Sequence, residues 1–119
     1  MISKEAANGL ISKLADKNIK EVVTEIAAEK ILANDEKLIK KARNIPEQEL
    51  IVFLRKELEA PEKGILIAKV HHEKKLKEYA IIKRIAEIEN IPEETAREYL
   101  LDIETFVCAS ALKKIINRS

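Results

Sequence analysis

The residues of this chain that can do chemistry are mostly charged side chains, and they are segregated along the sequence. Between Lys69 and Arg84, six cations oppose two glutamates, which leaves a net charge of +4. Such a surface can contact phosphates or an acidic partner. The predicted contact residues are Lys69, Lys74, Lys75, Lys77, Lys83 and Arg84. From Glu87 to Glu104, seven acids oppose one arginine, a net charge of −6. This stretch predicts contact with a basic partner through Glu93, Glu94, Glu98 and Asp102.

Residues that could form a nucleophile or a metal site occur without the spacing that such sites need. Cys108 lies in the apolar run 106–109, where a cysteine usually serves as a small buried hydrophobe. His71 and His72 are adjacent, so on a helix they point about 100° apart and cannot easily bind one ion. No glycine-rich phosphate loop or hydrolase motif is present. We therefore expect no catalytic, cofactor-binding or metal-ligating residue, no small-molecule substrate, and a protein that is not an enzyme.

The composition favours a single all-α domain over residues 1–119, with 1–60 and 61–119 as candidate sub-units. Hydrophobic residues make up 46% of the 119 residues, enough for a core, while two glycines and three prolines leave little room for the turns of a β fold. Lys, Glu, Ile, Leu and Ala dominate, as in proteins of hot-living organisms, where surface ion-pair networks are common. The net charge of +1 provides no global attraction for nucleic acid or an anionic membrane.

Two further absences in the sequence bear on location. The single cysteine excludes an internal disulfide and suits a reducing compartment. No apolar run is long enough to cross a membrane, and the N-terminus does not resemble a signal peptide. We therefore expect a cytoplasmic protein without a membrane contact.

The elements that position the charged residues are predicted from helical periodicity and capping residues. Ser3 is expected to cap a first helix reaching Leu14, in which Gly9 would mark the close approach of another helix. Asn34 and Asp35 predict a turn and a cap. Further helices are expected over 19–32, from 46 to 58, from 65 to about 89 with a break near His71, and from 92 to about 117. A short helix before residue 44 is expected to carry Leu38, Ile39 and Ala42. The apolar runs 50–54 and 65–68 could instead pair as a short hairpin, because periodicity alone does not decide.

The phrase Asn-Ile-Pro-Glu occurs twice, at 44–47 and 90–93, and predicts two sharp corners between helices. In each copy the asparagine is expected to adopt the left-handed conformation that closes a helix, and the proline to begin the next. The glutamate would meet the positive end of the new helix. A duplicated helix pair would explain the repeat, but the flanking residues agree poorly and capping chemistry alone would also produce it.

The second copy lies in a pattern that resembles the helix-turn-helix of bacterial and archaeal regulators. The matching positions are Ala86, Asn90, Ile91, Ala96 and Tyr99, whereas Glu89 departs from the pattern. The resemblance implies a second helix that enters the major groove through Glu93, Glu94, Arg97 and Glu98. Three of these four are acidic and phosphates would repel them, so the resemblance predicts a shape better than it predicts DNA binding.

The last predicted helix is unusually long for a domain of this size. Its 26 residues would extend about 39 Å, whereas the domain should measure about 26 Å across. Its C-terminal turns would pack on another copy or partner, or lie under the first two helices. We therefore expect a compact bundle of five or six helices, with a helix-turn-helix-like hairpin and a long C-terminal helix. The predicted function is a non-enzymatic protein-protein interaction or assembly module, including self-association. The alternative is a DNA-binding regulator of the helix-turn-helix type.

Overall fold

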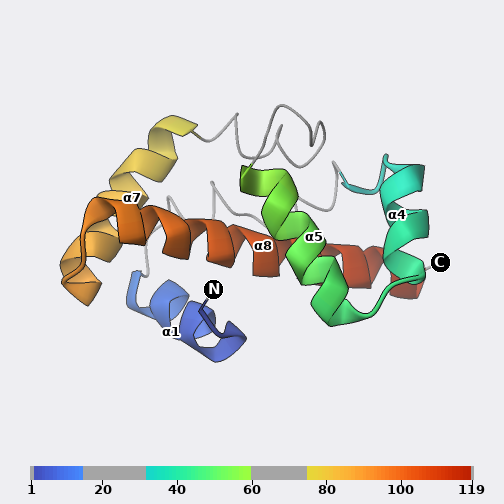
Figure 1. The fold of residues 1–119 in the computed structure, drawn as a ribbon, viewed down its shortest axis with the longest axis horizontal. Helices are drawn as coiled ribbons and strands as arrows, with labels where there is room; N and C mark the ends of the chain where they lie inside the picture. Colours follow the sequence, from blue (N-terminus) through green and yellow to red (C-terminus); the bar gives the residue numbers. More distant parts are fainter. Residues whose placement is uncertain (1, 15–31, 60–74, 119) are drawn as a thin grey trace.

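The computed structural model describes residues 2–14, 32–59 and 75–118, and over this part of the chain the fold is all-α. The helices are α1 (Lys4–Leu14), α4 (Glu36–Arg43), α5 (Glu47–Glu59), α7 (Lys75–Glu89) and α8 (Glu93–Arg118) (Figure 1). These ranges contain no strand, so the predicted fold class is confirmed. The apolar run 50–54 lies within α5 and is helical. The run 65–68 and the helix expected over 19–32 fall largely outside the described residues.

The long helix α8 forms the axis of the molecule, and the other described helices pack along it (Figure 1). Its 26 residues correspond to about 39 Å at 1.5 Å per residue. The molecule measures 40 × 26 × 24 Å, so its longest dimension is close to the length of this helix. Because α8 is too long for one set of neighbours, different helices cover its two halves.

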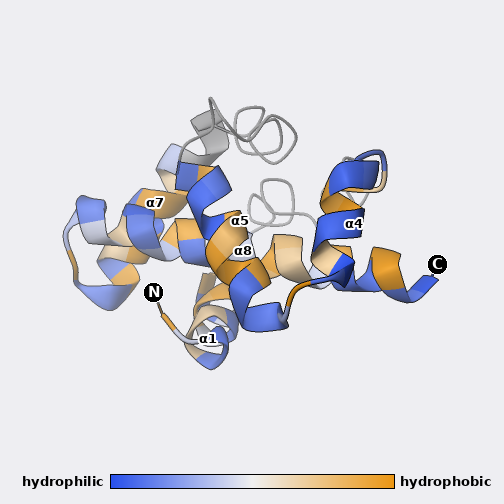
Figure 2. Cartoon of the chain, turned by 45° about the vertical axis from the view of Figure 1, so that its right-hand side comes forward, coloured by the Kyte–Doolittle hydropathy of each residue, from blue (hydrophilic) through white to orange (hydrophobic). Residues whose placement is uncertain are grey.

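The core is accordingly divided into two clusters along α8. The first cluster joins the C-terminal half of α8 to α4 and α5, and its buried members are Leu32, Leu38, Ala42, Leu50, Leu54, Leu58, Cys108, Ala109, Ala111 and Leu112. The second joins the N-terminal half of α8 to α1 and α7, and its buried members are Ala7, Leu10, Leu14, Ile81, Ile82, Ile85, Ala96, Leu100 and Ile103. Each short helix shows a hydrophobic and a hydrophilic face, as such packing requires (Figure 2).

The C-terminal turns of α8 are covered in a way that the sequence did not indicate. Of the described helices, α4 and α5 pack there, and Ile115 and Ile116 lie half-buried against the first cluster. The first helix instead packs on the other half of α8, with α7. Of the described helices, α4 and α5 thus cover part of these turns and α1 does not, while the second expected helix lies outside the described residues.

Local capping chemistry determines where two of the helices begin. The Ser3 hydroxyl oxygen accepts a hydrogen bond from the Ala6 N–H at 3.1 Å, and Asp35 Oδ1 accepts one from the Leu38 N–H at 3.1 Å. Both predicted caps are confirmed. The expectation for Gly9 is wrong, because a Cβ built there would meet no described atom within 4 Å. Gly9 lies on the exposed side of α1, opposite the packed side that Leu10 contributes to.

The corner between α7 and α8 has the backbone that the sequence predicts. Asn90 is left-handed, with φ of +52°, and the Ile91 N–H donates to the Ala86 carbonyl at 3.1 Å. This hydrogen bond, from the second residue beyond the helix to its last turn, belongs to a Schellman motif. The chain therefore reverses within residues 90–92, and α7 packs back extensively on α8.

The corner between α4 and α5 is built differently from the same four residues. Asn44 has φ of −101° and ψ of 0°, so the prediction of a left-handed residue is wrong here. Its N–H donates to the Lys41 carbonyl at 3.1 Å, and its side-chain amide donates to the Lys40 carbonyl at 3.0 Å. In both corners the helix begins at the glutamate, and the carbonyl of the preceding proline accepts the first helical hydrogen bond, at 3.0 Å.

Candidate interaction site

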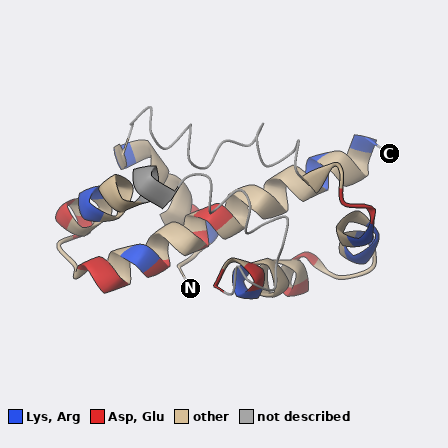
Figure 3. Cartoon of the chain, turned by 90° about the horizontal axis from the view of Figure 1, so that it is seen from above, with Lys and Arg blue, Asp and Glu red and all other residues tan. Residues whose placement is uncertain are grey.

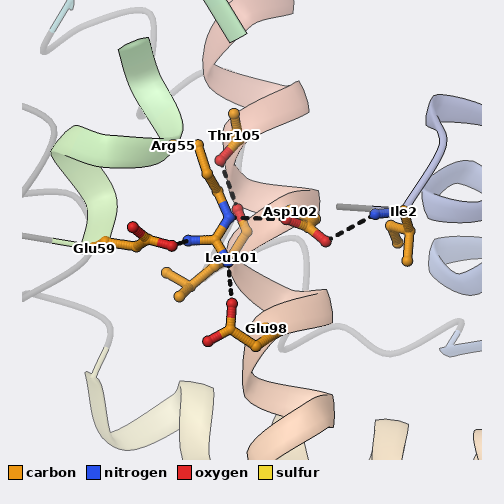
Figure 4. A network of polar contacts seen from close by, with 7 residues as sticks. All are labelled: Ile2, Arg55, Glu59, Glu98, Leu101, Asp102 and Thr105. Atoms are coloured by element: carbon orange, nitrogen blue, oxygen red, sulfur yellow. Dashed lines mark hydrogen bonds and ion pairs between the residues drawn. The ribbon is translucent and has the colours of Figure 1, made fainter. Parts of the chain in front are cut away.

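The strongest polar feature of the described residues is an arginine buried where α5 crosses α8 (Figure 4). Arg55 lies on the packed side of α5, one residue after the fully buried Leu54, and its side chain is 11% exposed. Its Nε donates to Asp102 Oδ1 at 2.8 Å, and the Asp102 side chain is 3% exposed. This buried ion pair lies between the two core clusters and joins α5 to α8.

Three further contacts complete the network around this pair (Figure 4). Nη1 of Arg55 donates to Glu59 at 2.5 Å, one turn along α5, and Nη2 donates to Glu98 of α8. The second oxygen of Asp102 accepts from the Ile2 N–H at 3.0 Å, which ties the start of the chain to α8. The guanidinium thus contacts three carboxylates.

The electrostatics of the network keep Arg55 charged. Burial by itself would lower the pKa of the Arg55 guanidinium, but the hydrogen bond to Asp102 and the surrounding carboxylates outweigh it, so the pKa is raised. One positive and three negative groups leave the network with a net charge of −2. The excess negative charge lies at the surface, because the Glu59 and Glu98 side chains are 51% and 59% exposed.

A hollow of about 490 Å³ opens beside this network. Its lining consists of Ile2, Arg55, Glu59, Glu98, Tyr99 and Asp102. Within this lining the paired Asp102 and Arg55 are buried, the two exposed glutamates contribute negative charge, and Tyr99 adds an aromatic side chain. The hollow therefore combines an apolar contact with uncompensated negative charge, which suits a cationic side chain.

The four predicted acidic contact residues divide between the surface and the interior. Glu94, Glu98 and Asp102 follow one another at four-residue intervals and so share one side of α8. Glu93 and Glu94 are exposed at the start of the helix. Asp102, by contrast, is buried. The sequence predicts that it contacts a basic partner, but its carboxylate is bound by Arg55 of the same chain.

The predicted basic contact residues do not gather into one described site. Lys69 and Lys74 lie outside the described residues, and Lys75 and Lys77 belong to the first turn of α7. Lys83 and Arg84 are exposed, and both contact neighbours on their own helix. The Lys83 ammonium lies 4.8 Å from the centre of the Tyr79 ring, and Arg84 lies 3.6 Å from Glu87.

A second basic surface, which the sequence did not indicate, lies where α4 meets the C-terminal end of α8 (Figure 3). We call it the basic end, and its exposed cations are Lys37, Lys40, Lys41, Arg43, Lys113, Lys114 and Arg118. Lys41 lies 3.9 Å above the Phe53 ring, and Lys113 donates to Glu47 at 2.9 Å. The cations of α4 and those of α8 are about seventy residues apart in the chain, so only the fold brings them together.

Other reactive groups of the described chain offer no second site. Burial, and then the nearby charge of Glu104, raise the pKa of the Cys108 thiol to about 12, so this cysteine is protonated at neutral pH. The described His, Cys, Asp and Glu residues form no group that could hold a metal ion. His71 and His72 lie outside the described residues. None of the described helices is both long and apolar enough to cross a membrane.

Comparison of the chain with family models, curated proteins and solved structures finds no significant match. The hollow and the charged surfaces are therefore the features of this chain that bear on its function.

Proposed function

We propose that this protein is a non-enzymatic interaction module that binds a basic protein segment at the hollow beside Arg55. The observation that carries the proposal is the net charge of −2 around an open hollow, with two glutamates exposed beside it. A lysine or arginine of a partner would meet Glu59 and Glu98 there. Its aliphatic stem would pack on Tyr99.

The saturation of Arg55 supports a cationic ligand over an anionic one. The guanidinium already donates to Asp102, Glu59 and Glu98, so a phosphate or carboxylate would have to displace one of them. An incoming anion would also be repelled by the remaining carboxylates. An incoming cation instead finds carboxylate oxygens at the surface and leaves the buried pair intact.

The charge of α8 also weighs against the DNA-binding alternative. In that alternative the cations between Lys69 and Arg84 contact the phosphates and the helix-turn-helix-like hairpin supports them. Glu93, Glu94 and Glu98 are exposed at the α8 side of this hairpin. Backbone phosphates supply most of the affinity in such complexes and would oppose these carboxylates. We therefore treat DNA binding as an outcome that the following experiment distinguishes.

The test is a titration of isotope-labelled protein with a lysine- and arginine-rich peptide, followed by NMR. We expect saturable shifts at Tyr99 and Glu98, and no comparable shifts with an acidic peptide or duplex DNA. The variant Glu59→Gln/Glu98→Gln should lower the affinity for the peptide about tenfold, because each exposed ion pair contributes under about 1 kcal/mol. Glu5→Gln/Glu36→Gln makes the same change in net charge on α1 and α4 and should bind as the wild type does.

Two results would contradict the proposal. One is equal peptide binding by the Glu59→Gln/Glu98→Gln variant and the wild type, with both folded by circular dichroism. The other is tight binding of duplex DNA at about 0.05 M salt that weakens steeply as salt is raised, which would favour the regulator alternative.

A further inference from the structure

We infer that the basic partner is a second copy of this chain, which places its basic end on the acidic surface of the first. The acidic surface consists of the exposed residues Glu59, Glu93, Glu94, Arg97 and Glu98, and it lies beside the buried pair of Arg55 and Asp102. This inference rests on the proposed function, because it names the source of the cations that would enter the hollow.

The two surfaces are matched in charge. The acidic surface has four exposed carboxylates and one arginine, a net charge of −3. At the basic end, seven cations are accompanied by the acids of the same turns, Asp35, Glu36, Glu47 and Glu49, which leaves a net charge of +3. Surfaces of opposite sign steer encounter between molecules and disfavour wrong partners. Although the net charge of the chain is only +1, its positive and negative charges are thus separated along the length of the molecule.

The acidic surface and the basic end of one molecule are too far apart to contact each other. Glu94 and Lys113 lie on the same helix, separated by about 28 Å at 1.5 Å per residue. This distance is several times the screening length of about 8 Å at physiological salt. Contact therefore requires two copies, with one end of the first on the opposite end of the second. Such a head-to-tail contact continues as an open chain unless its rotation closes a ring.

Helix dipoles account for only part of this polarity. Acids at the start of α8 and cations near its end are expected, because they complement the partial charges of the helix termini. Glu59 and Lys37 go against that rule. Glu59 is the last residue of α5, where the helix end is negative, and Lys37 lies in the first turn of α4, where it is positive. The charges of the two surfaces therefore exceed what helix stability alone would favour.

The experiment measures self-association by sedimentation velocity up to about 1 mM protein, at about 0.05 M and about 0.5 M salt. We expect reversible association of the wild type at the lower salt and its loss at the higher. Glu93→Lys/Glu94→Lys and Lys37→Glu/Lys40→Glu should each weaken self-association about tenfold or more, since each places like charges together. An equimolar mixture of the two variants should associate again, because the reversed surfaces are complementary.

A matched variant separates surface contact from overall charge. Lys56→Glu/Lys83→Glu carries the same net charge as Lys37→Glu/Lys40→Glu but keeps both surfaces intact. It should therefore self-associate as the wild type does, whereas Lys37→Glu/Lys40→Glu should not. A wild type that stays monomeric throughout, or a mixture that is not rescued, overturns the inference. Neither result affects the peptide titration, so a failure here is distinguishable from a failure of the proposed function.

Discussion

Two corners of this molecule have the same four residues, Asn-Ile-Pro-Glu, and two different backbones. Asn90 takes φ of +52° and Asn44 takes φ of −101°. After the left-handed residue, α7 lies back against α8, whereas α4 has its larger contact with α8 and separates from α5 (Figure 1). The comparison teaches that the phrase determines where one helix ends and the next begins. It does not determine the angle between them.

Tertiary packing explains the choice at each corner. A left-handed asparagine allows the Ile91 N–H to reach the Ala86 carbonyl, which brings Ile91 against the cluster shared by α1, α7 and α8. At the other corner, Ile45 packs against the cluster of α4, α5 and α8. There the Asn44 side chain caps the Lys40 carbonyl, so no left-handed residue is needed. Asparagine supports both solutions because its amide can bond locally and its backbone tolerates positive φ.

The helices that follow the two corners, α5 and α8, are joined by the buried ion pair of Arg55 and Asp102. Breaking this pair should have the largest effect on stability. Arg55→Met would leave the buried Asp102 without its guanidinium partner and should lower the free energy of unfolding by about 3–5 kcal/mol. Urea denaturation measures this loss. Replacing the pair together, as Arg55→Met/Asp102→Leu, should recover most of the stability, because no unpaired buried charge remains.

The exposed members of the network provide the control for that measurement. Glu59→Gln and Glu98→Gln each remove a carboxylate that is more than half exposed, so each should cost less than about 1 kcal/mol. If Arg55→Met were no less stable than these two variants, the buried pair would not be the main link between α5 and α8.

Glycine substitutions at the two asparagines should have opposite signs. Asn90→Gly relieves a positive φ and should raise stability by up to about 1 kcal/mol, whereas Asn90→Ala should cost about 1–2 kcal/mol. Asn44→Gly loses the bond to the Lys40 carbonyl and gains chain entropy, so it should cost about 0.5–1 kcal/mol. Thermal unfolding of the four single variants, with Asn44→Ala as the fourth, measures these differences. Equal signs for the two glycine variants would mean that the corners are energetically alike.

Local chemistry is the part of this fold that could be predicted from the sequence. The caps at Ser3 and Asp35 and the long helix α8 depend on residues within a few positions of one another. The same holds for the left-handed residue at Asn90, although the identical reasoning was wrong for Asn44. A short-range pattern identifies a set of allowed conformations, and the packing of distant helices selects among them.

The candidate site could not be predicted because its parts are far apart in the chain. Arg55 and Asp102 are separated by 47 residues, and Arg55 interrupts the buried apolar positions of α5 between Leu54 and Leu58. That interruption was the available signal, since a charge among the buried positions of α5 needs a partner. The basic end had a weaker signal, because the short α4 and the last turns of α8 are ordinary cationic stretches until the fold joins them. The sequence interpretation therefore gave the acidic half of the proposed interface and missed Arg55, Glu59 and the basic end.

The smallest expected effect concerns the glutamates that begin the two helices, Glu47 and Glu93. A hydrogen bond from Lys113 lowers the pKa of Glu47, so this pair stabilises the fold above the unfolded pKa of a glutamate, about 4.3. The stabilisation is lost as pH falls through the lowered folded pKa. Lys113→Met should therefore cost a few tenths of a kcal/mol at neutral pH, since both side chains are largely exposed and screened by water.

Thermal unfolding of the wild type and Lys113→Met across pH measures this effect. The two melting temperatures should converge as pH falls through the lowered pKa of Glu47, because the carboxylate is then protonated in both proteins. Glu93→Gln is the matched variant at the other corner, and in the described part of the chain Glu93 has no ion pair comparable to that of Glu47. Its effect should come from the helix terminus alone and should be insensitive to Lys113→Met. A pH-independent gap between wild type and Lys113→Met would assign the stabilisation to the packing of the lysine stem. The two corners would then differ in backbone but not in charge.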